Sequence, residues 1–228
     1  PTISGFRRYI HFDNSASTPT FEPIWRAVCE TWQQPEHVRR EIGEETRNIV
    51  ADFFGAPLEE YDVVFASNTT EALNVAAQFI AGQVKGDVEP IVLNTLLEHN
   101  SNELPWRFHF GLMHLRLHVD DEGFVDLREL EALLREYNQA HAHGKQRIQL
   151  VAVSGESNVL GAFNDLAAIS QLAHQYGARV LVDAAQRAAH RRVEMEAWNI
   201  DYLAFSAHKM YAPFGSGGLV VRHSLRTP

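Results

Sequence analysis

The chain has 228 residues, of which 45% are hydrophobic and 21% are charged, so it is long enough to bury a sizeable core. Its 20 Lys and Arg against 29 Asp and Glu give a formal net charge of −9, and the absence of a basic cluster argues against nucleic acid as a partner. No apolar run approaches the ~20 residues of a membrane span. The single cysteine, Cys29, excludes an internal disulfide and favours the reducing cytoplasm.

Residues 1–55 are predicted to form an N-terminal arm with helices. Apolar side chains recur at helical spacing through residues 36–56, and Gly55 ends the pattern. Cys29 falls in another helical pattern, so we interpret its thiol as buried and unreactive.

Short, continuous apolar runs recur through the rest of the chain and predict strands that are covered on both faces. The seven runs span residues 62–66, 90–94, 112–117, 148–154, 179–184, 201–206 and 217–222. Helical patterns lie between most of them, at residues 69–82, 126–138 and 165–177. This alternation predicts one α/β domain over residues 56–228 with a mostly parallel sheet. The connection 207–216 has no helical pattern, so the last strand is predicted to run antiparallel to the sixth.

Polar side chains follow several of these strands, at the edge where open α/β sheets bind ligands. Thr69 and Thr70 open the helix after the first strand, where they suit a phosphate or simply cap the helix. His99 follows the second strand and is either a packing residue or a functional one. Asn158 follows the fourth strand between two glycines, where a plain turn is the alternative.

The residues at the ends of the fifth and sixth strands are the most specific indication of the chemistry of the site. Asp183 places a carboxylate at the mouth of a buried strand, where it needs a cation unless it caps the next helix. Lys209 lies in a confined loop and has the reactivity to form a Schiff base with an aldehyde. A phosphate site, a flat imidazole, an acid and a lysine together match pyridoxal phosphate, which we predict as the cofactor.

Other classes of function receive less support from the sequence. No G-x-G-x-x-G follows the first strand, which argues against a dinucleotide site. His141 and His143 lie in a loop without further ligands at useful spacing, and residues 119–123 resemble a tight turn, so no metal site is predicted.

The chain resembles the class V, fold-type I pyridoxal-phosphate enzymes, in particular cysteine desulfurases and selenocysteine lyases. The segments that carry the resemblance run from one end of the chain to the other: FDNSASTP (12–19), FASNTTEALN (65–74), LEHNSNELPW (97–106), SNVLGAFNDL (157–166), VDAAQ (182–186) and FSAHKMYAPFGSGGLVVR (205–222). The resemblance implies a three-layer large domain with a seven-stranded sheet whose last strand is antiparallel. It also implies an amino-acid substrate and a homodimer with each site near the subunit interface.

The resemblance also implies a role for each site residue. Lys209 would carry the Schiff base and later act as a base, Asp183 would pair with the pyridinium nitrogen, and catalytic His99 would stack on the ring. The remaining implied contacts are Gln186 with the phenolic oxygen, Asn158 with the ring substituent or substrate, Thr69, Thr70, Ser206 and His208 with the phosphate, and Asn14 with the substrate entrance.

Two departures from the family pattern concern the phosphate site and the length of the chain. Asn68 stands where relatives commonly have glycine. Family members also continue into a smaller C-terminal domain, so we expect this chain to be the cofactor-binding portion of a longer enzyme. Cysteine desulfuration, with a sulfur-acceptor protein as partner, is the predicted reaction. An aminotransferase, an epimerase, a β-lyase and a catalytically silent module remain open.

Overall fold

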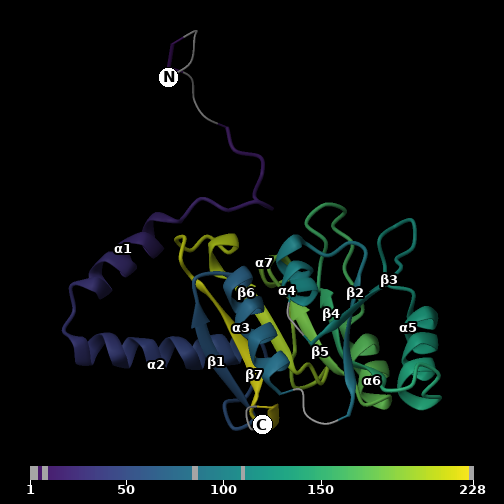
Figure 1. The fold of residues 1–228 in the computed structure, drawn as a ribbon. Helices are drawn as coiled ribbons and strands as arrows, with labels where there is room; N and C mark the ends of the chain where they lie inside the picture. The colour runs from purple at the N-terminus through teal and green to yellow at the C-terminus, as the bar shows by residue number, and fades with distance from the viewer. Residues whose placement is uncertain (1–4, 7–9, 84–86, 109–110, 226–228) are drawn as a thin grey trace.

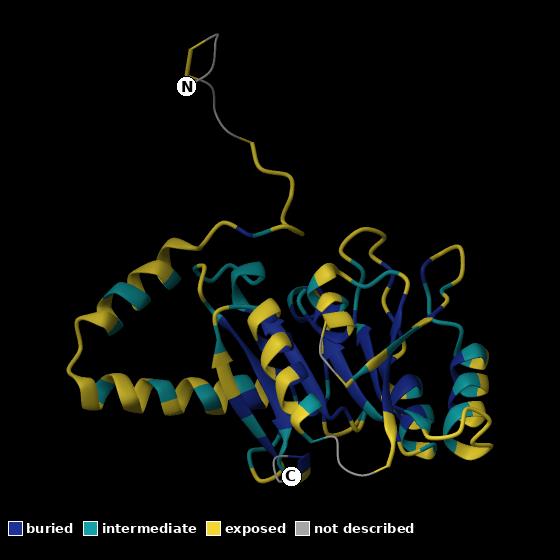
Figure 2. Cartoon of the chain, in the orientation of Figure 1, coloured by how far each residue is buried: buried dark blue, intermediate teal, exposed yellow. Residues whose placement is uncertain are grey.

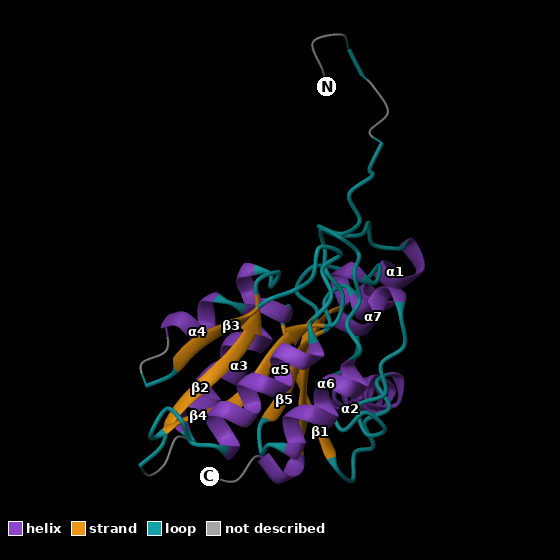
Figure 3. Cartoon of the chain, turned by 90° about the vertical axis from the view of Figure 1, so that its right-hand side faces the viewer, coloured by secondary structure: helices purple, strands orange, loops and turns teal. Residues whose placement is uncertain are grey.

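The computed structural model describes residues 5–6, 10–83, 87–108 and 111–225. The described chain forms three layers, with a seven-stranded sheet between two layers of helices (Figures 1 and 3). The strands stand in the order β1-β7-β6-β5-β4-β2-β3. Their bounds are β1 Tyr61–Ala66, β2 Glu89–Thr95, β3 Met113–Leu117, β4 Gln146–Ser154, β5 Arg179–Asp183, β6 Tyr202–Ser206 and β7 Gly217–Arg222.

The direction of the last strand agrees with the prediction. β7 lies between β1 and β6 and pairs antiparallel with both, whereas the other pairs of neighbouring strands are parallel. The predicted α/β fold with a seven-stranded, mostly parallel sheet is therefore confirmed. All strands except β7 consequently direct their carboxyl ends toward the same edge of the sheet.

Successive side chains of the central strands enter two different hydrophobic clusters, as the period of two along a strand requires. Leu93 of β2 packs in the cluster that contains Leu130 of α5 (Leu127–Leu134) and Ile169 of α6 (Leu166–Gln175). The adjacent Val92 packs in the other cluster with Leu73 of α3 (Thr69–Gly82). Burial on both faces explains why these strands are continuously apolar in sequence (Figure 2).

The three helices predicted within residues 56–228 form, and each begins at a side-chain cap. Asp126 caps α5 and Asp165 caps α6, as the sequence indicates. Asn68, and not a threonine, caps α3 by accepting a hydrogen bond from the Glu71 amide. The predicted helix 126–138 is α-helical to Leu134 and ends in a π-helical turn, Arg135–Gln139. Two further helices, α4 (Leu104–Phe108) and α7 (Arg187–His190), are too short to give a periodic pattern.

The N-terminal helices extend away from the sheet (Figure 1). α1 (Glu22–Trp32) buries none of its residues, and α2 (Glu36–Phe53) buries Ala51 alone. The helix around Cys29 forms, but the predicted burial of its thiol is wrong, because α1 packs on no core and leaves Cys29 partly exposed. The segment before α1 is held by the loop after β6, because the Thr18 amide and hydroxyl both donate to the carbonyl of His208, at 3.2 and 2.8 Å. The arm therefore passes directly beside the predicted lysine loop. Within the described residues, no helix combines the length and apolar composition needed to cross a bilayer.

Candidate functional site

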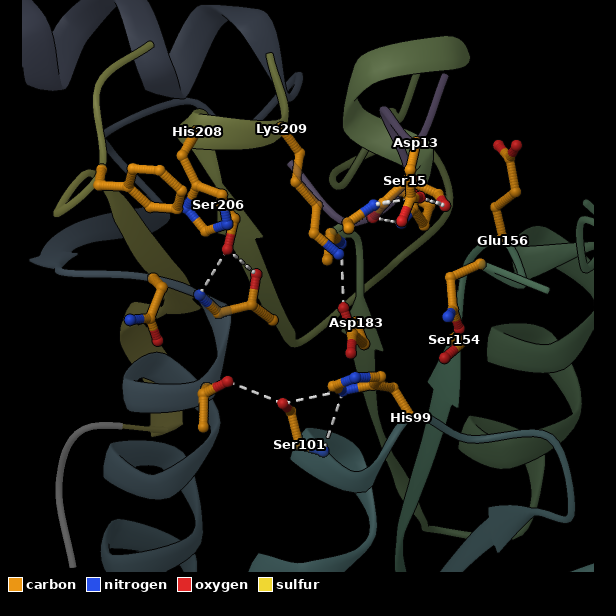
Figure 4. Close-up of a pocket in the computed structure, with 18 residues that line it drawn as sticks. Asp13, Ser15, His99, Ser101, Ser154, Glu156, Asp183, Ser206, His208 and Lys209 are labelled. Atoms are coloured by element: carbon orange, nitrogen blue, oxygen red, sulfur yellow. Dashed lines mark hydrogen bonds between the residues drawn. The ribbon is translucent and has the colours of Figure 1, made fainter. Parts of the chain in front are cut away.

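A cavity of about 570 Å³ opens at the carboxyl edge of the sheet (Figure 4). The residues predicted to contact the cofactor all line it: Thr69, Thr70, His99, Asn158, Asp183, Gln186, Ser206, His208 and Lys209. Asn14 is not among the lining residues, although its neighbours Asp13 and Ser15 are. The fold thus gathers into one site side chains that are spread over most of the sequence.

The acid and the lysine reach this cavity from neighbouring strands. Asp183 is the last residue of β5, and Lys209 ends the 3₁₀ turn Ala207–Lys209 that follows β6, the parallel neighbour of β5. Figure 4 shows the Lys209 side chain extending toward Asp183. Asp183 is 5% exposed, and its Oδ1 accepts one hydrogen bond, from the Ala185 amide at 2.9 Å.

Burial perturbs both of these groups. It raises the pKa of Asp183, an effect that the Ala185 hydrogen bond and the charges of Lys209 and His99 oppose. It lowers the pKa of Lys209, an effect that the carboxylates of Asp183 and Asp13 oppose. A lysine with a lowered pKa has more neutral, nucleophilic amine near neutral pH, and perturbed pairs of this kind mark functional sites.

Ser101 holds the imidazole of His99 through its backbone amide and its hydroxyl. The Nδ1 of His99 accepts a hydrogen bond from the Ser101 amide at 3.1 Å and lies 2.9 Å from the Ser101 hydroxyl. The Ser101 hydroxyl is in turn 2.7 Å from the hydroxyl of Thr70. These contacts fix the imidazole at the wall of the cavity, where a flat ring could lie against it. Since Nδ1 is an acceptor, the neutral imidazole carries its proton on Nε2.

A buried carboxylate, Glu98, fixes the backbone that carries His99. Its two oxygens accept hydrogen bonds from the Thr95 hydroxyl, the Asn102 side-chain Nδ2 and both the backbone amide and the hydroxyl of Ser154, at 2.6 to 3.0 Å. Burial raises the pKa of Glu98, whereas these hydrogen bonds lower it. Glu98 thus ties the ends of β2 and β4 to the turn after His99. Sequence reasoning missed it, and the only signal was its place beside His99 in LEHNSN.

The other end of the cavity offers hydroxyl groups at the start of α3. The amide and the hydroxyl of Thr69 both lie 2.8 Å from the Ser206 hydroxyl. Because Asn68 caps the helix, the threonine hydroxyls are not used as caps. Gly217 permits this approach, since a Cβ there would lie 2.8 Å from the Asn68 Cα and 2.6 Å from the Phe205 carbonyl oxygen.

His208 and the N-terminal arm complete the lining. Nδ1 of His208 is buried and has no hydrogen-bond partner, and burial, with a smaller effect from Lys209, lowers the pKa of this ring. Phe214 stacks on the ring at a centroid distance of 5.2 Å. Gln186 donates to the Ser15 carbonyl at 2.6 Å, which holds the arm against the cavity. Glu156 and Ser154 line the remaining wall near Asn158.

The chemistry of these residues fits pyridoxal phosphate. Hydroxyls at the amino end of a fourteen-residue helix suit a phosphate, and the unpartnered Nδ1 of His208 is a buried group that an added anion or donor could satisfy. The half-satisfied Asp183 suits a ring N–H, and Lys209 suits an aldehyde. Among the residues that the structure describes, no group of three or more His, Cys, Asp or Glu side chains could hold a metal ion.

Together, the fold and the cavity define an α/β protein in which a half-buried lysine faces a buried aspartate at the carboxyl edge of the sheet. The family model "Aminotransferase class-V" matches residues 10–228, and the chain belongs to this family. The match spans nearly the whole sequence, so it includes the arm as well as the sheet.

Several proteins that are similar to this chain are named cysteine desulfurases. The chain is 40% identical over 185 residues to a cysteine desulfurase from Dickeya dadantii, a match that covers 80% of this chain and 42% of that protein. It is 33% identical over 227 residues to a probable cysteine desulfurase from Pyrococcus abyssi, covering 93% of this chain and 52% of that one. The apo structure of a cysteine desulfurase from Thermococcus onnurineus NA1 superposes with a TM-score of 0.81 at 33% identity, covering 93% and 53% of the two chains.

The chain is also shorter than the relatives that it matches. It spans between 32% and 52% of the length of the first curated relatives that it matches. The fold of the solved relative confirms the predicted fold-type I architecture.

Proposed function

We propose that this chain is the pyridoxal-phosphate-binding part of a cysteine desulfurase-like enzyme, with residues 56–228 as the large domain and residues 1–55 as its arm. The observation that supports the proposal most strongly is that Lys209, Asp183 and His99 line one cavity together with the hydroxyl groups at the start of α3. When bound, pyridoxal phosphate supplies an aldehyde that takes up an amine and a ring that withdraws electrons from it.

The chain's own residues would hold the cofactor at three points. Lys209 Nζ would hold the aldehyde carbon, and Asp183 would hold a proton at the ring nitrogen. Thr69, Thr70, Ser206 and His208 would hold the phosphate at the start of α3. His99 would lie against the ring, in an orientation fixed by Ser101. Gln186 and Asn158 would contact the ring substituents, and Asn14 would lie near the substrate entrance.

Lys209 has a second task once substrate amine replaces it. Because burial lowers its pKa, the released ε-amine is a competent base at the substrate α-carbon. Asp183 would hold a proton at the ring nitrogen only as long as its carboxylate stays ionised. The hydrogen bond from the Ala185 amide favours that form against the effect of burial, as does the charge of Lys209 whenever its amine is protonated. Lys209 would thus act as the proton acceptor, and Asp183 would supply a fixed negative charge.

The proposed substrate is cysteine, which an enzyme thiol would convert to alanine while the thiol becomes a persulfide. The only cysteine of this chain, Cys29, lies in α1 and does not line the cavity. The described residues therefore account for activation of the amino acid and not for acceptance of its sulfur. We include a sulfur-acceptor protein, a homodimer and a cytoplasmic setting in the proposal, the last because a single cysteine suits a reducing compartment.

The products of the full-length protein with L-cysteine test this proposal. A desulfurase yields alanine and persulfide in equal amounts, and added dithiothreitol releases the sulfur as sulfide. A β-lyase yields pyruvate and ammonia with the sulfide, an aminotransferase yields a keto acid, and an epimerase yields D-cysteine. Failure to form any of these, with cofactor absorbance present, would contradict the proposed reaction. A visible spectrum that neither appears with pyridoxal phosphate nor changes with borohydride would contradict the cofactor.

A further inference from the structure

A second cavity, of about 480 Å³, shares no lining residue with the first. It lies beside the start of α6 and the start of α7, and Phe124, Phe163 and Trp198 contribute aromatic walls. Two charged side chains, Arg187 and Asp165, also line it. A mostly apolar hollow with a small number of charged groups is the usual form of a small-molecule site.

Arg187 is the unusual member of this lining. It is 8% exposed, and no described carboxylate forms an ion pair with it. Its Nη1 donates to the carbonyls of Gly155 and Asn164, at 3.3 and 3.1 Å, and its Nε is buried without an acceptor. A buried guanidinium is costly unless it is paired, and the two carboxylates that favour its charge, Glu156 and Asp165, form no ion pair with it, which makes a further partner the natural explanation.

Two aromatic rings and Gly155 surround the Arg187 side chain and hold its guanidinium in place. Its Cζ lies 5.4 Å from the Trp198 ring centroid and 6.0 Å from that of Phe163. Gly155 leaves room for the side chain, since a Cβ there would lie 3.0 Å from the Arg187 Cδ. With Nη1 engaged and Nε enclosed, Nη2 is the nitrogen that an occupant of the cavity can reach. The ring contacts stabilise the cation but accept no hydrogen bond from Nη2.

The charges around Arg187 indicate which charged groups a ligand in this cavity should have. Glu156 and Asp165 favour the charged guanidinium, whereas the nearby Arg191 opposes it. Asp165 uses Oδ1 to cap α6 through the Ala168 amide at 3.0 Å and lines the same cavity. A simple anion would meet this carboxylate unfavourably, but a zwitterion would meet complementary charges at both residues.

We propose that this second cavity binds an apolar α-amino acid, with the carboxylate on Arg187, the ammonium facing Asp165 and the side chain among Phe124, Phe163 and Trp198. The site is independent of the cofactor cavity, so its test does not depend on the proposed function. A charge-assisted contact to Nη2 of Arg187 would supply most of the specificity for the carboxylate.

Equilibrium dialysis of the full-length protein against three related ligands tests the assignment. L-Phenylalanine has both charged groups, 3-phenylpropionate lacks the ammonium, and L-phenylalaninamide lacks the carboxylate. We expect L-phenylalanine to bind most tightly, with Arg187→Gln weakening it about tenfold or more and Asp165→Asn, which keeps the helix cap, weakening it less. Arg40→Gln makes the same change of charge at an exposed position of α2, outside the cavity lining, and should leave the affinity nearly unchanged.

The ligand series keeps the proposal falsifiable even if Arg187→Gln does not fold. Equal binding of the amide and L-phenylalanine to the unaltered protein would overturn the role of Arg187. Equal binding of 3-phenylpropionate and L-phenylalanine would overturn the role of Asp165 and the assignment of an amino acid. Absence of binding by all three ligands at about 10 mM, which corresponds to less than about 3 kcal/mol of affinity, would overturn the site itself.

Discussion

Two aspartates are buried to the same extent in this molecule, each 5% exposed, but they lie at opposite edges of the sheet. Asp201 precedes β6 and accepts hydrogen bonds from His174 and the Val180 amide, at 2.7 and 2.8 Å, with the Arg222 Nε at 3.6 Å. Asp183 ends β5 and accepts one hydrogen bond, from the Ala185 amide. The first carboxylate is satisfied by its neighbours, whereas the second accepts one hydrogen bond from the described residues and retains capacity for a further donor.

The difference shows that burial alone does not mark a functional group. A buried carboxylate that is fully paired stabilises the fold around it, and its removal leaves cations without partners. A buried carboxylate with spare capacity is held at a cost in stability, which proteins accept at sites of binding or catalysis. Substitutions at the two positions should therefore have opposite consequences for activity and for stability.

The largest expected effect is that of Asp183→Asn on turnover. The amide cannot hold a proton at a ring nitrogen as a carboxylate does, so kcat of the full-length protein on L-cysteine should fall at least about a hundredfold. The free energy of unfolding should stay the same or rise, because a poorly satisfied buried charge is removed. Steady-state kinetics and urea denaturation measure the two quantities. Retention of most of the turnover would refute the assigned role.

Asp201→Ala should show the reverse pattern. It leaves His174 and the Val180 amide without their acceptor and removes one of the two ion-pair partners of Arg222, so the free energy of unfolding should decrease by about 3 kcal/mol. Turnover per folded molecule should be unchanged, since Asp201 lies at the far edge of the sheet. A loss of turnover without a loss of stability would contradict the contrast between the two aspartates.

Gly217→Ala tests the close approach on which the phosphate end depends. The new Cβ would meet the Asn68 Cα and the Phe205 carbonyl, so we expect a loss of about 2 kcal/mol and weaker binding of pyridoxal phosphate. Gly43→Ala is the matched control, because its Cβ would meet nothing within 4 Å in α2. That change should raise stability by about 1 kcal/mol and leave cofactor affinity unaltered. Equal effects of the two substitutions would remove the special role of Gly217.

The smallest expected effect is a shift in pH dependence. Only the neutral amine attacks an aldehyde, and burial lowers the pKa of Lys209 below the ordinary value of 10.5. The rate at which the cofactor-free protein binds pyridoxal phosphate should therefore rise with pH and reach half its maximum below pH 10.5. Asp183→Asn removes a carboxylate that raises this pKa, so the midpoint should move lower still. Stopped-flow absorbance gives the profile, and a midpoint at or above 10.5 would contradict the buried amine.

Most of the sheet could be predicted because its strands are buried on both faces and therefore read as continuous apolar runs. The side chains at the strand ends could be anticipated for the same reason: parallel strands bring their carboxyl ends together whatever the loops do. Asp183, Lys209 and His99 are found in this way. Their roles toward a cofactor rest on the resemblance and stay predictions.

Contacts between distant segments could not be predicted in the same way. Glu98 is fixed by Ser154, a residue 56 positions away, and nothing in the local sequence indicates that contact. Asn14 lies in an irregular arm, where no period shows which side chains face the cavity, and its neighbours Asp13 and Ser15 line it instead. The partners of Arg187 likewise appear only when the turn after β4 and the start of α7 are folded together.

The most direct test of the central claim is to locate the cofactor on the chain after borohydride reduction. The chain has three lysines, Lys85, Lys145 and Lys209, of which Lys145 pairs with Asp87 outside the cavity. Peptide mass mapping of the full-length protein should place the reduced pyridoxal phosphate on Lys209. Lys209→Ala should abolish the modification, and Lys145→Ala should leave it intact. Attachment at another lysine, or none while the protein remains folded, would contradict the account.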